Sequence, residues 1–253
     1  MSTVYSEKNK SLLDKTSFFM GYLPAGYPDR QKFTSLLESC CKLGMDVAEV
    51  GFPSKNPFAD GDVIRHAHKA IDCTVSADID YWRAIRASCP NPLWIMGYFA
   101  DLVESGAYRK LAEENLVDAF VIPDCDDCSY RRIQKELTPY GVDMVRLVRP
   151  NSDEKVIREY FQSSAFIYYQ LFNGLTGGSQ AMEDFSQVLS IAREYGHIRI
   201  LAGFGVNTPK QARLLLDAGF DGITIGTAMV RELNASAENL LEFVGQIVRE
   251  IKG

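Results

Sequence analysis

The chain has 253 residues, 46% of them hydrophobic, so it can bury a sizeable core in one or two domains. Its net charge is −6 and its Lys and Arg residues are scattered singly, which excludes a basic stripe for nucleic acid. No apolar run approaches the roughly 18–20 residues of a membrane span, and residues 1–15 lack the apolar core of a signal peptide, so we expect a soluble cytoplasmic protein.

Eight short β-rich runs recur along the chain, and segments with helical spacing of apolar residues separate them. The predicted strands are 18–23, 46–51, 93–98, 118–122, 143–148, 165–170, 198–202 and 222–225. The predicted helices are 30–43, 79–88, 108–115, 129–140, 154–162, 182–195 and 209–218, with a long closing helix over 228–252. Turn residues stand at the expected connections, for example Gly44 before the second strand and Gly219 before the eighth.

Eight strands that alternate with helices predict an α/β protein with a single (β/α)₈ TIM barrel, in which residues 1–253 form one domain with a short N-terminal helix. A doubly wound open sheet is the alternative. Such a sheet usually has fewer strands and a glycine fingerprint after the first one. Here the first strand is followed by Pro24-Ala-Gly26-Tyr-Pro28, which lacks that fingerprint.

Two carboxylates mark the second predicted strand and the loop after it. Glu49 lies in the run 47–50, whose other side chains are apolar on both faces, and Asp60 lies in the Pro/Gly-punctuated loop. Such a strand is normally buried on both sides, and an unpaired ionised carboxylate there costs several kcal/mol. Glu49 must therefore find a partner, keep its proton or take part in chemistry. A structural salt bridge and a functional role both remain open at this point.

The cysteines and histidines offer weaker signals. The six cysteines belong to a long chain without a secretion signal, so we expect reduced thiols. Cys125-Asp-Asp-Cys128 has the spacing of a redox or zinc motif, but the chain has no second such pair and its histidines lie far off, so we expect no metal site. His66 and His68 fall on a probable helix, where positions i and i+2 do not share a face. We expect both at the surface.

Glycine-containing loops follow the last three predicted strands. In a barrel, phosphate often binds between the loops after strands seven and eight, which here carry Gly203-Phe-Gly205 and Gly226-Thr227. Glycines let the backbone approach an anion closely, and the N-terminus of the closing helix offers unpaired N–H groups. A third set, Gly174-Leu-Thr-Gly177-Gly178, follows strand six. Together these loops predict a site for a phosphate monoester.

Several motifs occur together along the chain: Gly21-Tyr-Leu-Pro-Ala-Gly26-Tyr-Pro28, Glu49-Val-Gly-Phe-Pro53, Pro57-Phe-Ala-Asp60-Gly61, Met96-Gly-Tyr98, Pro123-Asp124, Tyr168, Gly174-Leu-Thr-Gly177, Gly203-Phe-Gly205 and Ile225-Gly-Thr227-Ala-Met-Val230. With them the chain resembles, nearly end to end, the tryptophan synthase alpha subunit family, which cleaves indole-3-glycerol phosphate to indole and glyceraldehyde 3-phosphate. The Glu and Asp eleven residues apart are specific to that family. The glycine loops alone would fit many phosphate-binding barrels.

The resemblance implies a role for each matching position. Glu49 matches the catalytic acid/base, Asp60 the carboxylate that accepts the indole N–H, and Tyr168 a supporting active-site tyrosine. The walls around the indole match Tyr22, Met96 and Phe204, and the phosphate cradle matches Gly177, Gly205, Gly226 and Thr227. The implied chemistry needs a proton on Glu49 for indole C3 and an ionised Asp60 beside N1–H, with no metal or organic cofactor. Residues 174–182 resemble a lid over the phosphate.

The chain departs from the family's pattern where a partner would sit. The resemblance implies a tryptophan synthase beta subunit as partner, and positions 56 and 100 face that subunit in the family. Here the interface positions Lys55, Asn56 and Ala100 are altered. Three alternatives follow: a stand-alone lyase that releases free indole, a non-catalytic regulatory subunit, or a barrel whose changes at Tyr27 and Lys55 admit another substrate.

Overall fold

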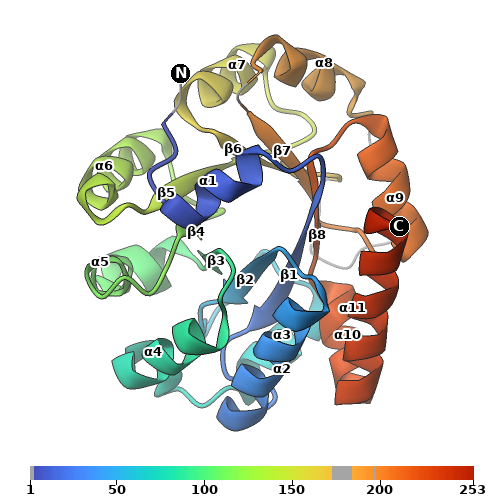
Figure 1. Cartoon of the computed structure of the whole chain (residues 1–253). Coiled ribbons are helices and arrows are strands. Elements are labelled where there is room, and N and C mark those ends of the chain that lie inside the picture. Colours follow the sequence, from blue (N-terminus) through green and yellow to red (C-terminus); the bar gives the residue numbers. More distant parts are fainter. Residues whose placement is uncertain (1–2, 173–183, 197) are drawn as a thin grey trace.

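The computed structural model describes residues 3–172, 184–196 and 198–253. Its eight strands are parallel and pair in chain order, and β8 pairs back with β1 to close a barrel (Figure 1). The strands are β1 (Phe18–Pro24), β2 (Val47–Gly51), β3 (Leu93–Met96), β4 (Ala119–Val121), β5 (Asp143–Val148), β6 (Phe166–Gln170), β7 (Arg199–Gly203) and β8 (Gly222–Ile225). The predicted (β/α)₈ barrel is confirmed, and the open-sheet alternative is wrong because the ring of strands has no free edge.

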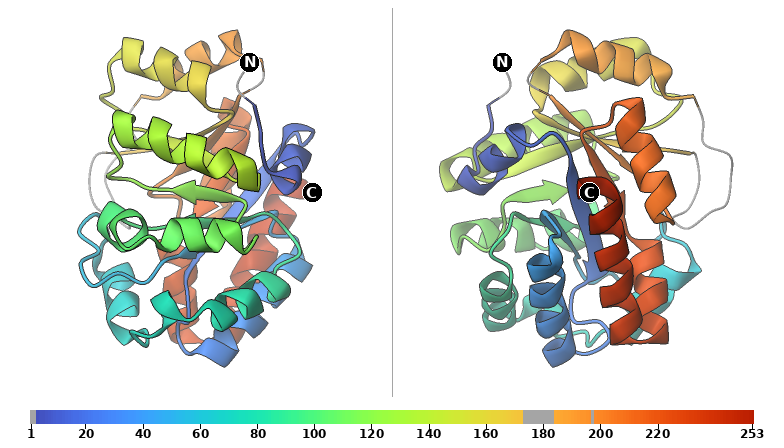
Figure 2. Two further views of the ribbon diagram at one scale, coloured as in Figure 1. Left: turned by 90° about the vertical axis from the view of Figure 1, so that its left-hand side faces the viewer. Right: turned by 45° about the vertical axis from the view of Figure 1, so that its right-hand side comes forward.

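Helices form the outer layer around the strands (Figure 2). They are α1 (Glu7–Leu13), α2 (Arg30–Leu43), α3 (Asp62–Ala70), α4 (Ile79–Ser88), α5 (Ala107–Glu113), α6 (Asp127–Leu137), α7 (Glu154–Ser163), α8 (Ser186–Glu194), α9 (Pro209–Ala218), α10 (Thr227–Ala235) and α11 (Ala237–Lys252). Single turns lie at Val75–Ala77, Ala100–Glu104 and Thr138–Tyr140. Within the described ranges, no helix is long and apolar enough to cross a membrane.

The prediction of one continuous closing helix over 228–252 is wrong. The segment consists of α10 and α11, which meet at Ser236. The backbone of Ser236 is extended, with φ −168° and ψ 165°, and its side chain accepts a hydrogen bond from the N–H of Asn239. A serine in this conformation caps the second helix, so the chain turns there although its apolar spacing continues.

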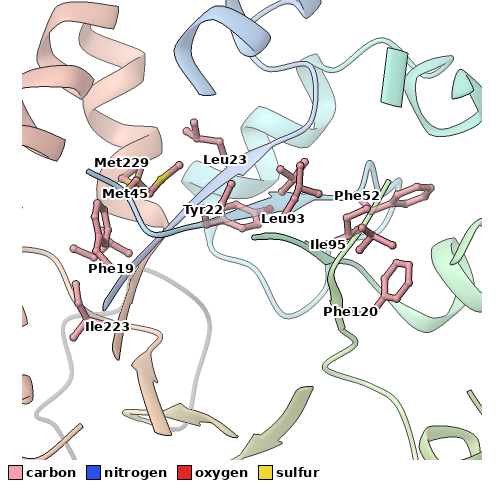
Figure 3. Packing of buried hydrophobic residues seen from close by; sticks show 14 of the residues in the cluster. Phe19, Tyr22, Leu23, Met45, Phe52, Leu93, Ile95, Phe120, Ile223 and Met229 are labelled. Atoms are coloured by element: carbon pink, nitrogen blue, oxygen red, sulfur yellow. The ribbon is translucent and has the colours of Figure 1, made fainter. Parts of the chain in front are cut away.

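The core has two layers because successive strand side chains point to opposite faces of the barrel wall. On β1, Phe18 and Met20 point inward and pack with the inner side chains of the other strands. Phe19 and Leu23 point outward into the larger layer between strands and helices (Figure 3). Every residue of β1 is buried, as expected for a strand of a parallel barrel.

The N-terminal helix α1 covers the end of the barrel where the strands begin. The side-chain amide of Asn9 donates to the backbone oxygen of Asp118, 3.0 Å away, and to Oδ2 of Asp143, 2.9 Å away. The same side chain accepts from the indole N–H of Trp94 inside the barrel, at 2.8 Å. Because this end is covered, the opposite end, where the strands finish, is the one left for a site.

Candidate active site

A cavity opens at the carboxyl ends of the strands, and the described residues that the sequence predicts for the site line it together. These residues are Tyr22, Glu49, Asp60, Met96, Tyr168, Phe204, Gly205, Gly226 and Thr227. The empty volume is about 440 Å³, including the opening to solvent. Predicted Gly177, with the rest of the loop 174–182, lies outside the described residues. Sequence reasoning missed four further lining residues, which are Ile64, Val206, Asn207 and Thr224.

The strand β2 places the Glu49 carboxyl inside the mouth of the barrel. Val47 belongs to the inner layer of the core, whereas Ala48 and Val50 belong to the outer one. Glu49 follows Val47 by two residues, so it shares the inward face one step closer to the mouth. The sequence alternation therefore directs a carboxyl group into the cavity.

Glu49 is held in surroundings that disfavour its charge. Its side chain is buried, with 1% of the residue exposed, and its Oε1 atom has no hydrogen-bond partner within the described part of the chain. Burial, and secondarily the negative charge of Asp60, raises the pKa of Glu49 from 4.5 to about 8. No described Lys or Arg forms an ion pair with it. Of the two readings left open by the sequence, the structural salt bridge is therefore excluded for these residues.

Asp60 sits in a different environment, on the loop after β2. The Tyr98 hydroxyl at the end of β3 donates to Oδ2 of Asp60 over 2.6 Å, and the N–H of Ala59 donates to the same hydroxyl oxygen at 3.2 Å. Burial, and then the nearby Asp60, raises the pKa of Tyr98, so its hydroxyl keeps its proton and acts as donor. The sequence analysis gave Tyr98 no role, although its place after a barrel strand is a signal for the site.

The raised pKa of Glu49 gives a pH-dependent prediction with two readouts. A reaction that needs the protonated carboxyl should lose rate as pH rises through about 8. The folded protein also keeps a proton that the unfolded chain releases above pH 4.5, so this group's contribution to the free energy of unfolding is present below 4.5 and lost by about 8. We expect the melting temperature of Glu49→Gln to rise relative to the original protein between pH 5 and pH 8. A constant difference over that range would contradict the shifted pKa.

Aromatic side chains form the walls of the cavity, as the sequence predicts. The rings of Tyr168 and Phe204 meet edge to face, with centroids 5.5 Å apart and planes at 73°. The backbone of Phe204 has φ +59°, which is unusual for a bulky residue and turns its ring toward the mouth. Tyr22 stands on β1, in register with Glu49 on the neighbouring strand. These surfaces suit a flat, apolar ligand group beside the carboxyl pair.

Backbone groups after β7 and β8 form the anion-binding part of the cavity. Thr227 is the first residue of α10, and Gly226 before it supplies no side-chain cap, so the first N–H groups of this helix are open to a ligand. Gly205 has φ +125°, a conformation that favours glycine. The Asn207 side chain donates to the Gly205 oxygen at 2.7 Å and holds this loop in place.

The prediction of two surface histidines is correct for His66 and wrong for His68. Both lie on α3, whose outer face exposes His66 and whose inner face buries His68 against the barrel. The Cys125–Cys128 pair carries free thiols, of which Cys128 is exposed. In the described parts of the chain, no group of three or more His, Cys, Asp or Glu residues could hold a metal ion.

The altered positions lie outside the cavity. Lys55 and Ala100 line an open groove on the outer side of the loops after β2 and β3, together with Lys69 and Lys110. Asn56, next to Lys55, is exposed.

Comparisons with known proteins agree with this geometry. A sequence profile described as "Tryptophan synthase alpha chain" matches residues 9–251. Among curated relatives, the tryptophan synthase alpha chain of Petrotoga mobilis is 29% identical, covering 91% of this chain and 90% of its own. That of Geobacter sulfurreducens is 30% identical, with 83% and 82% covered.

Solved structures share the fold. A structure of Mycobacterium tuberculosis tryptophan synthase matches with a TM-score of 0.84 at 20% identity and covers 100% of both chains. A mutant alpha-subunit from the hyperthermophile Pyrococcus furiosus matches with a TM-score of 0.80 at 21% identity, covering 94% of this chain and 98% of its own. Because the sequence profile spans almost the whole chain, we conclude that this protein belongs to the tryptophan synthase alpha chain family.

Proposed function

We propose that the protein is a lyase that cleaves indole-3-glycerol phosphate by a retro-aldol reaction to indole and glyceraldehyde 3-phosphate. The observation that carries this proposal is a buried, proton-holding Glu49 that shares a cavity with Asp60 and with the open helix end at Thr227. A carboxyl acid, a second carboxylate and an anion site are the three functions that this substrate requires.

In the proposed reaction, the Glu49 carboxyl gives its proton to indole C3. The ring becomes a cation, and the Asp60 carboxylate accepts a hydrogen bond from N1–H and stabilises that charge as it develops. The bond between C3 and C3′ then breaks, its electron pair returns to the ring, and the C3′ hydroxyl becomes the aldehyde. The hydroxyl proton goes to the Glu49 carboxylate, which restores the acid for the next turnover.

A product assay tests the proposal directly. The purified protein is incubated with indole-3-glycerol phosphate, and indole and glyceraldehyde 3-phosphate are measured. Formation of both products in equal amounts supports the lyase. If neither forms, with or without a beta subunit, while the phosphate ligand still binds, the chain would instead be a regulatory binding subunit.

We propose a tryptophan synthase beta subunit as the partner, docked over the groove that Lys55 and Ala100 line, with Asn56 beside it. The exposed lysines Lys55, Lys69 and Lys110 give this surface positive charge. Gel filtration with a beta subunit, together with indole assays in its presence and absence, tests the pairing. Negligible activity alone that rises steeply with the partner supports it, whereas full activity alone and no complex supports a stand-alone lyase.

The phosphate grip can be tested at Thr227. Replacement by Val keeps the shape but removes the hydroxyl, so we expect KM for indole-3-glycerol phosphate to rise about threefold to tenfold, as for one lost hydrogen bond, with kcat nearly unchanged. Thr227→Ser keeps the hydroxyl and serves as the matched control. An unchanged KM in the Val variant would show that this hydroxyl does not contact the phosphate.

A further inference from the structure

Buried His68 has no part in the reaction as proposed above, yet it stands next to the cavity. It lines a side pocket that shares Tyr22 and Asp60 with the main cavity, and it also lines the outer groove. Its ring therefore forms part of the wall between the two. With 7% of the residue exposed, this is an unusual place for a histidine without a task.

The hydrogen bonds of His68 define where its proton lies. The backbone N–H of Ser54 donates to Nδ1 at 3.3 Å, so Nδ1 carries no proton. Burial lowers the pKa of His68 to about 4, so the ring is neutral at pH 7. The single ring proton must then be on Nε2, which lies 3.2 Å from the Tyr22 hydroxyl oxygen. Nε2–H donates to Tyr22.

This arrangement determines what the Tyr22 hydroxyl can do. Because its oxygen accepts from His68, its own proton is left to be donated elsewhere, and no other described residue accepts it. The two carboxyl groups nearest to the phenol in electrostatic terms are those of Asp60 and Glu49. Room for the oxygen is made by Gly51, where a Cβ atom would lie only 2.3 Å from it.

We propose that His68 is a positioning residue, which holds the Tyr22 phenol in the cavity wall and directs its O–H proton toward the Glu49 and Asp60 carboxylates. The inference rests on the proposed lyase function. When Glu49 gives its proton to indole C3 it becomes an anion, and a donor already aimed at that side of the cavity stabilises the charge as it forms. His68 acts through Tyr22 and does not touch the substrate.

The kinetic test uses four variants. His68→Phe keeps a flat ring but cannot hold Tyr22, and Tyr22→Phe removes the hydroxyl itself. We expect each to lower kcat about threefold to tenfold with little change in KM, as for one hydrogen bond made mainly in the transition state. The double variant should be no worse than either single one. His68→Gln, whose side-chain N–H can replace Nε2–H, should recover most of the lost rate.

His66→Phe, on the exposed face of the same helix, is the matched control and should leave kcat unchanged. If His68→Phe lowers only the melting temperature, or if its effect adds to that of Tyr22→Phe, His68 is merely structural and the inference fails.

A second readout does not need turnover. Spectra of ¹⁵N-labelled histidine should show His68 as the neutral ring protonated at Nε2 from pH 6 to pH 8. A proton on Nδ1, or a charged ring at pH 7, would overturn the inference alone. The expected ring state in a protein that makes no indole would overturn the proposed function, and with it the catalytic consequence of the pairing.

Discussion

Replacement of Glu49 by Gln is expected to lower kcat for indole formation by about 10²–10⁴-fold, the usual loss when a positioned acid/base is removed. Gln has nearly the same shape, but its amide cannot give a proton to indole C3. Binding of the substrate should persist, since the walls and the anion site do not depend on this carboxyl. Single-turnover rates and KM, measured at pH 7, separate the chemical step from binding.

The exposed Glu159 on α7 provides the control, because Glu159→Gln makes the same chemical change far from the cavity and should keep full activity. The Glu49→Gln protein should also be at least as stable as the original at pH 8, since it no longer buries an ionisable group. If Glu49→Gln changes neither turnover nor regulation of a partner, the acid role is wrong and a binding subunit becomes the better interpretation.

The outline of the barrel could be read from the sequence because local signals coincide with the elements. The helix Arg30–Leu43 begins after a capping Asp29 and ends at Gly44 with φ +113°, so both of its ends were predicted correctly. Strand Asp143–Val148 was also predicted with its observed bounds. The break at Ser236 was missed because apolar spacing runs through it, although a serine three residues before Asn239 is a capping signal.

The site was predictable as far as it depends on the ends of strands. Glu49, Phe204 and Thr227 follow or close strands, and parallel strands bring their carboxyl ends to one mouth. Contacts across the chain were not predictable. The spacing of His66 and His68 shows that they face differently, but only the packing of α3 against β1 decides which one is buried.

The second large effect is expected at Asp60. We predict that Asp60→Asn lowers kcat by about 10²–10³-fold, in the range found when one preorganised electrostatic contact is removed. The amide oxygen can still accept from indole N1–H, so binding should change little. It carries no negative charge, however, and the charge is what stabilises the cation formed when C3 gains its proton. The loss should therefore appear in kcat and not in KM.

Two controls sharpen this test. Asp62→Asn changes an exposed carboxylate two residues later and should have no effect on kcat. Tyr98→Phe removes the 2.6 Å hydrogen bond to Asp60 but leaves its charge, so we expect a smaller loss, about threefold to tenfold. If Asp60→Asn were no worse than Tyr98→Phe, the charge would not matter and Asp60 would serve only to orient the ring. The order Asp60→Asn well below Tyr98→Phe is what a developing cation requires, because a neutral acceptor can orient N1–H but only a carboxylate can balance its charge.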